Sequence, residues 1–346
     1  MATLKDLSEY TGYSIATISR ILNNDPSMSA SEETRRRIIK AAETLNYAET
    51  KSKKGRNQKD VLKIGVVLSC PFEWRKEEFE TEWLKCIEDV CTKAKISWVK
   101  IELGAYLPSD VVQTNLDGIL AVGVFQDAQT NWIMHINKNV IFVDASEDEL
   151  HYDAVVINVH AGMAQAVEHL KEYGHEQIGF FGPCGKQKCW TRRVLNEVLH
   201  DIYRDAMRVY GIDKNAWILS AEVDIQKSEQ VMTEYINSGN KLPTAIIAAS
   251  MENALGAINA FEKAGIEIPK DISIIAFCDV DKCKNEINRL TLVHVQEEYM
   301  CRAAIRLIGE KLPGHTIHGV RYTPKKVMIP PVLESGKSVA EPRICY

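Results

Sequence analysis

A short stretch near the N-terminus carries the side chains best suited to contact a nucleic acid. It runs at helical spacing and offers small apolar, hydroxyl and basic groups: Ser14, Ile15, Ala16, Thr17, Ser19, Arg20 and Asn23. Apolar groups contact the methyl group of thymine, hydroxyls contact phosphates, and an arginine binds guanine or phosphate. These residue types at this spacing predict a helix that reads DNA.

Three short helices are expected to position these side chains. The first covers residues 4–10, and Gly12 then breaks the pattern. Ser14 is a good N-cap for a second helix over 15–22, and a third is expected over 32–45. Two short helices joined by a glycine-containing turn form the geometry that lays the second helix in the major groove. A three-helix bundle without a role on DNA is the alternative.

The next segment, residues 48–60, has almost no apolar side chains and is rich in lysine and arginine, so we expect a linker. Residues 1–60 hold eleven Lys and Arg against eight Asp and Glu, whereas the remaining 286 residues hold 31 against 39. A basic end on an acidic body indicates that a polyanion would bind locally, at the N-terminal end.

From residue 61 onward, strand-like and helix-like segments alternate, which predicts parallel sheets covered by helices on both faces. The span is too long for one sheet of ordinary size, so we expect two α/β lobes. Strands are expected near 62–68, 96–102, 117–123, 139–143, 154–158, 177–181, 244–248, 272–277 and 324–329. Helices are expected near 76–94, 160–173, 189–210, 227–238, 250–264 and 296–311.

Polar side chains follow three of these predicted strands. Ser69, Asp144 and Asp279 come directly after or near the carboxyl ends of strands 62–68, 139–143 and 272–277. Open α/β sheets bind ligands at this edge, so these residues are candidates for contacts to a small molecule.

The sequence gives little support for a membrane protein, a secreted protein or an enzyme. No apolar stretch approaches the roughly 20 residues that span a bilayer, and the N-terminus lacks a secretion signal pattern, so we expect a cytoplasmic protein without a membrane partner. The nine cysteines are expected to be reduced, and their spacing fits no structural zinc site. Gly182–Lys186 is neither a P-loop nor a dinucleotide fingerprint, and no catalytic or metal-ligating constellation stands out. We therefore expect no enzyme activity, no metal and no cofactor.

The N-terminal sequence closely resembles the signature of the LacI/GalR family of repressors. The matching segments are Thr3–Ser8, Gly12–Asn23, Ser31–Arg35 and Leu45–Tyr47. The resemblance continues at lower identity through the body, for example at Lys63–Val66, Phe142–Asp144 and Ile268–Ser273.

The resemblance implies an all-α helix-turn-helix headpiece followed by an α/β periplasmic-binding-protein-like core of two Rossmann-like lobes joined by three crossings. The implied boundaries are 1–47 for the headpiece and 48–60 for a basic linker. Lobe 1 would hold 61–158 with about 290–320, and lobe 2 would hold 159–289 with about 321–333.

The resemblance also implies a homodimer that reads a pseudo-palindromic operator. Thr3 and Leu4 would contact DNA as an arm, beside the recognition-helix residues named above. A small sugar-like effector would lie between the lobes and modulate a repressor of a sugar-utilisation operon. Arg192 joins the candidate effector contacts by this alignment, because a guanidinium donates to vicinal hydroxyls that a carboxylate accepts from. Ser250 joins them because it stands at a position where the family usually has asparagine.

The sequence departs from the family pattern in the linker. Family members carry a hinge helix whose leucine wedges into the minor groove, whereas Gly55 and Arg56 occupy the aligned positions here. Lys53, Lys54 and Arg56 are expected either to contact phosphates or the minor groove, or to form a tether that contributes only charge. In the core, Ser250, Met251 and Cys278 replace residues usual in the family, so three alternatives stay open. The core could bind a sugar, it could bind no ligand and be controlled by a protein partner on lobe 1, or the chain could act as a free-standing sugar-binding protein.

Overall fold

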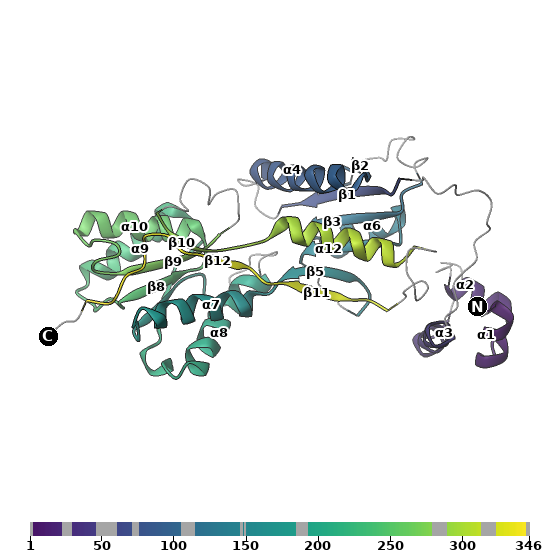
Figure 1. Cartoon of the computed structure of the whole chain (residues 1–346), viewed down its shortest axis with the longest axis horizontal. Helices are drawn as coiled ribbons and strands as arrows, with labels where there is room; N and C mark the ends of the chain where they lie inside the picture. The colour runs from purple at the N-terminus through teal and green to yellow at the C-terminus, as the bar shows by residue number, and fades with distance from the viewer. Residues whose placement is uncertain are drawn as a thin grey trace. The chain divides into compact units, whose positions relative to one another are not determined.

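The computed structural model describes residues 3–22, 30–45, 61–70, 76–104, 115–145, 148, 150–184, 193–278, 289–312 and 323–343 (Figure 1). The candidate residues Asn23, Lys53, Lys54, Arg56, Arg192 and Asp279 lie outside these ranges. The chain divides into two compact units, one holding Met1–Val156 and Met300–Val327, the other holding Ile157–Tyr299 and Met328–Tyr346.

The headpiece consists of three helices: α1 (Leu4–Thr11), α2 (Ile15–Leu22) and α3 (Glu32–Thr44). A capping box at Thr3 starts α1, and Gly12 ends it in the left-handed region at φ 77°, where a side chain would be strained. The apolar stripes of the three helices meet in one small core: Leu7, Ile18, Ile21, Leu22, Ile38, Ala41 and Ala42. The predicted helices are therefore confirmed to within about a residue at each end.

The first lobe is a six-stranded sheet in the order β11-β5-β4-β3-β1-β2, and the pairs from β2 to β5 are parallel. Its strands are β1 (Lys63–Ser69), β2 (Ser97–Lys100), β3 (Gly118–Gly123), β4 (Val140–Asp144), β5 (Asp153–Ile157) and β11 (Lys326–Ile329). Its helices are α4 (Lys76–Ala94), α6 (Asp127–Ile136) and α12 (Glu297–Glu310). Ile133 of α6 packs with Phe142 and Ala154 on one face of this sheet.

The second lobe repeats this plan, with strand order β12-β10-β9-β8-β6-β7 and one antiparallel pair, β10 with β12. The strands are β6 (Ile178–Gly182), β7 (Trp217–Ser220), β8 (Ala245–Ala248), β9 (Ser273–Cys278), β10 (Thr291–His294) and β12 (Val332–Glu334). The helices are α7 (Val159–Glu172), α8 (Arg193–Val209), α9 (Ile225–Asn237) and α10 (Met251–Ala264).

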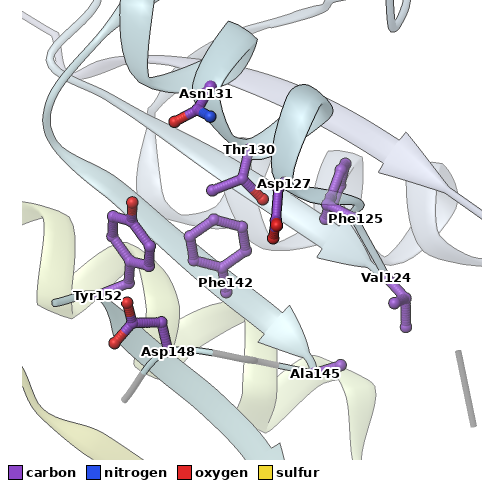
Figure 2. Close-up of a pocket in the computed structure, with 10 residues that line it drawn as sticks. Val124, Phe125, Asp127, Thr130, Asn131, Phe142, Ala145, Asp148 and Tyr152 are labelled. Atoms are coloured by element: carbon purple, nitrogen blue, oxygen red, sulfur yellow. The ribbon is translucent and has the colours of Figure 1, made fainter. Parts of the chain in front are cut away.

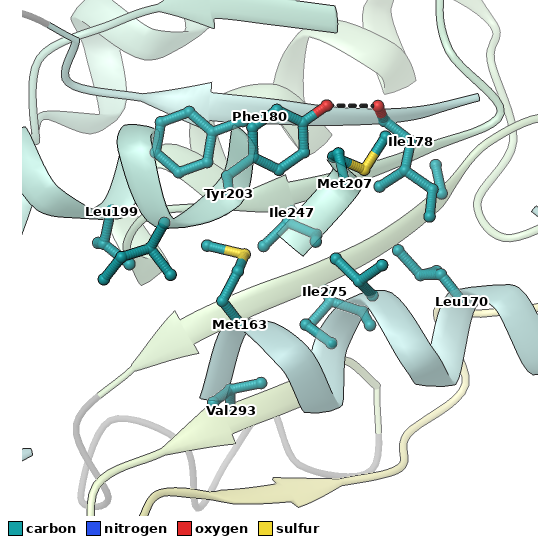
Figure 3. Close-up of a cluster of buried hydrophobic side chains, with 14 of the residues drawn as sticks. Met163, Leu170, Ile178, Phe180, Leu199, Tyr203, Met207, Ile247, Ile275 and Val293 are labelled. Carbon is teal, nitrogen blue, oxygen red and sulfur yellow. Dashed lines mark hydrogen bonds between the residues drawn. The ribbon is translucent and has the colours of Figure 1, made fainter. Parts of the chain in front are cut away.

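Alternation along the second lobe's strands splits its core into two layers. Phe180 and Ile247 pack against α7 and α8, whereas Phe181 and Ile246 pack against α9 and α10. In the first layer the fully buried Tyr203 donates a hydrogen bond from its hydroxyl to the carbonyl of Ile178 at 2.8 Å (Figure 3). The buried phenol therefore has a partner, as a polar group in such a core requires.

A buried ion pair joins three segments of the first lobe. The Asp153 side chain, at the start of β5, has no exposed surface, and its Oδ2 lies 2.5 Å from Nζ of Lys311, which follows α12. Its Oδ1 accepts a hydrogen bond from the backbone N–H of Lys325, just before β11, at 2.6 Å. One carboxylate thus fixes β5, the end of α12 and the start of β11 to one another.

The structure differs from the sequence-based expectations at several points. β10 belongs to the second sheet because it pairs with β9, although residues 290–320 were expected with lobe 1. β11 belongs to the first sheet, although residues 321–333 were expected with lobe 2. Helix α6 and strands β7, β10 and β12 were not predicted. Cys278 is disulfide-bonded, whereas all cysteines were expected to be reduced; Cys70, Cys86, Cys91, Cys184 and Cys301 are reduced thiols.

Candidate DNA-reading helix and effector edge

Helix α2 places its predicted DNA contacts on the side away from the headpiece core. Ile18, Ile21 and Leu22 are buried, whereas Ile15 is 46% exposed. Ala16 and Arg20 are exposed as well, and Thr17 and Ser19 are half-buried. The amphipathic split follows the helical period, so burying one stripe necessarily presents the other.

Two hydroxyls of the expected contact set also start helices. The Thr17 backbone N–H donates to Ser14 Oγ at 3.1 Å, so Ser14 caps α2. Thr3 caps α1. Its backbone N–H and its hydroxyl both donate to the Asp6 carboxylate and lower the pKa of Asp6, the backbone N–H having the larger effect. Leu4, expected in a DNA-contacting arm, is half-buried and packs against the headpiece core. Its apolar side chain therefore contributes to packing.

In the first lobe, the structure brings Ser69 and Asp144 to the same edge of the sheet. Ser69 ends β1 in register with Gly123 of β3, and Gly123 is in register with Asp144, which ends β4. Gly123 has φ 95°, and a Cβ there would lie 2.1 Å from the Ser69 carbonyl oxygen. Only glycine fits between them, and the sequence reasoning missed this residue although it ends a buried run.

The backbone at this edge turns sharply. Asp144 has φ 79°, a conformation that aspartate tolerates better than most residues. The adjoining Val124 backbone N–H donates to the Ser69 carbonyl at 3.1 Å. These contacts fix a hydroxyl and a carboxylate at the carboxyl ends of parallel strands, where such sheets bind ligands.

In the second lobe, Ser250 has a structural contact. It caps α10, its Oγ accepting from the Asn253 backbone N–H at 3.2 Å and donating to Asn253 Oδ1 at 3.0 Å. Its side chain is buried, and Asn253 continues the network to the Ser228 hydroxyl at 2.8 Å. A contact from Ser250 to an effector, like those from Arg192 and Asp279, stays a prediction.

The described residues contain no cluster of His, Cys, Asp and Glu that could hold a metal ion. None of their helices combines the length and apolarity that crossing a bilayer requires.

Comparison with known proteins decides the family. Residues 3–49 match the family described as bacterial regulatory proteins, lacI family, and residues 167–339 match the periplasmic binding protein-like domain. The HTH-type transcriptional repressor MelR of Bacillus subtilis (strain 168) is 30% identical over 342 residues, which is 96% of each chain. The chain belongs to the lacI family.

Two solved structures share the fold. The lac repressor dimer bound to operator and the anti-inducer ONPF has a TM-score of 0.59 and 21% identity, covering 98% of this chain and 99% of that one. The regulator CCPA from Weissella paramesenteroides with bound glucose has a TM-score of 0.61 and 18% identity, covering 81% and 98%. The predicted fold class is confirmed, and this lacI-family protein is a DNA-binding transcription regulator, not an enzyme.

Proposed function

We propose that this regulator represses a sugar-utilisation operon in the cytoplasm by inserting α2 of each subunit of a homodimer into successive major grooves of a pseudo-palindromic operator. The observation that carries the proposal is the exposed first turn of α2, where Ile15 and Ala16 stand opposite the buried stripe. Both are apolar, so base reading at these positions rests on contact with thymine methyl groups.

Operator binding by purified variants tests this reading. On DNA from upstream of the protein's own gene, R20A should weaken binding by about 1–3 kcal/mol, roughly tenfold or more, in fluorescence anisotropy. K40A is the matched control, because Lys40 is an exposed cation on α3. Equal losses of affinity in R20A and K40A would show that Arg20 contributes only its positive charge.

A change of specificity provides a second test of α2. Glutamine makes bidentate hydrogen bonds to adenine, so A16Q should select a different base pair from a randomised operator library. If A16Q selects the same sequence as the wild type, Ala16 does not face the bases.

The basic linker is proposed to supply the DNA contact that a hinge leucine supplies elsewhere in the family. Each lysine or arginine that neutralises a phosphate adds about −0.9 to the slope of log affinity against log salt concentration. Replacing Lys51, Lys53, Lys54 and Arg56 by alanine should therefore flatten this slope. An unchanged affinity and slope would leave the linker as a tether only.

The effector is proposed to be a neutral sugar that contacts Ser69 and Asp144 at the edge of the first lobe. A carboxylate accepts from sugar hydroxyls, and a relative of the same fold holds glucose. A ligand that binds only the folded protein raises its melting temperature. A thermal-shift screen of monosaccharides and disaccharides should give a hit that D144N removes, with operator release by the same sugar. No stabilising sugar, with operator binding intact, would contradict a sugar effector.

A further inference from the structure

A pocket in the first lobe lies beside the Ser69–Asp144 edge but has walls of its own. Its volume is about 220 Å³. The ends of β3 and β4, the first turns of α6 and the segment that leads into β5 enclose it (Figure 2). Ligand pockets for drug-sized molecules usually measure roughly 300–1,000 Å³, so this one has room for a single small ring.

Three aromatic rings form the apolar wall of the pocket. Phe142 of β4 lies between Phe125 and Tyr152, with ring centroids 5.9 Å and 5.3 Å away. The Phe125 and Phe142 side chains also belong to the core under α6, which holds them in place. A rigid aromatic wall suits the C–H face of a ring ligand.

Two carboxylates and several neutral polar groups complete the lining of the pocket (Figure 2). Asp148 is oriented by its own loop: its Oδ1 accepts from the backbone N–H groups of Leu150 and His151, and its Oδ2 lies 2.7 Å from His151 Nδ1. Asp127 lies in the first turn of α6, where the helix dipole favours its negative charge, and it makes no hydrogen bond or ion pair within the described residues. Asp127 is therefore available to accept from a ligand.

The pKa of the tyrosine at the pocket wall is raised by its surroundings. Burial raises the pKa of Tyr152, and the charges of Asp148 and Asp127 raise it further. Its hydroxyl therefore keeps its proton and stays a donor next to two acceptors.

The lining selects for hydroxyl groups. The described residues around the pocket include no lysine or arginine, which disfavours an anion. Thr130, Asn131 and Tyr152 each offer both a donor and an acceptor. An ammonium ion only donates, so it would leave these donors unpaired, whereas a sugar hydroxyl donates and accepts at once. The mixture favours a neutral polyhydroxylated ring over an organic cation.

We propose that this pocket is a binding site for one neutral monosaccharide ring, formed within the first lobe and separate from the Ser69–Asp144 contacts. The ring packs against Tyr152, beside the buried Phe142, and its hydroxyls donate to Asp127 and Asp148.

Calorimetric titration of the full chain with D-glucose, D-galactose and D-ribose tests the proposal, with putrescine as the cationic probe. At least one sugar should bind, and D127N and Y152F should each weaken its binding about tenfold or more. The matched control is D201N, because Asp201 is an exposed aspartate on α8 in the other lobe. Hydrogen exchange should show protection by the sugar in peptides covering 123–131 and 148–152.

Each contrary result has a distinct meaning. Binding that is lost in S69A and D144N but kept in D127N and Y152F supports the proposed effector site and overturns this pocket. Binding of putrescine without any sugar overturns the choice of ligand, and saturable binding of none of the three sugars overturns the site. If D127N loses sugar binding in calorimetry but still releases its operator when the effector is added, the pocket is supported independently of the proposed function.

Discussion

The buried ion pair between Asp153 and Lys311 allows a quantitative test of what holds the first lobe together. Replacing Lys311 by methionine keeps most of its volume but removes the cation beside a carboxylate that has no exposed surface. The Lys325 N–H remains at 2.6 Å, yet a neutral donor does not replace the cation beside a buried charge. Breaking a buried pair from one side costs about 3–5 kcal/mol, so K311M should lose that much unfolding free energy.

Urea-induced unfolding followed by circular dichroism measures this loss. The matched control is K270M, because Lys270 pairs with Glu267 at the surface, where both side chains are more than half exposed. An exposed pair contributes about 0–1 kcal/mol, so K270M should be close to wild type. The deficit of K311M should also shrink at acidic pH, where a proton on Asp153 removes the buried charge. Equal stability of the two variants, or a deficit that does not depend on pH, would refute the assigned role of the pair.

Three further predictions concern single residues. G123A should lower the melting temperature far more than the control G239A. Both glycines have positive φ, but a Cβ at Gly123 would lie 2.1 Å from the Ser69 carbonyl oxygen, whereas a Cβ at Gly239 would meet no atom within 4 Å. Similar losses in the two variants would contradict the close approach at Gly123. Burial lowers the pKa of His175 below its ordinary 6.5, so the folded state favours the neutral ring. The contribution of His175 to the unfolding free energy should be fully present above pH 6.5 and be lost as the pH falls through the lowered pKa. H175Q should flatten this pH dependence in melting curves recorded at several pH values. An unchanged pH dependence in H175Q would show that other groups cause it. Y203F should cost about 1–3 kcal/mol in urea unfolding because it leaves buried backbone groups without their phenol partner, and a neutral result would show that water replaces it.

Sequence reasoning succeeded where periodicity and capping agree. The helices of the headpiece have buried stripes at helical spacing and polar caps, and the structure reproduces them closely. It failed at α6, whose first turn is capped by Gln126 and Gln129 and not by the usual Ser, Thr, Asp or Asn. It also missed β7, a four-residue edge strand whose residues are half-buried or exposed, so it shows no apolar alternation.

The candidate site shows the same division. Ser69 and Asp144 could be placed at strand ends from the buried runs before them, and strand register then brings them to one edge. The pocket could not be found in this way, since Phe125, Phe142 and Tyr152 come from three segments. Only the fold determines that these rings meet on the α6 face of the sheet.

The interleaving of the two lobes along the chain has a consequence for protein synthesis. The first sheet is completed only by β11, through the hydrogen bond from the Ala154 N–H to the Lys325 carbonyl, and the second only by β12 and the contact of Ser338 with Ile274. Among the described residues, the headpiece core is formed by side chains from Leu4 to Leu45. On the ribosome the DNA-contacting helices can therefore fold long before either lobe is finished. A chain whose translation stops before β11 would therefore retain the headpiece with neither lobe complete.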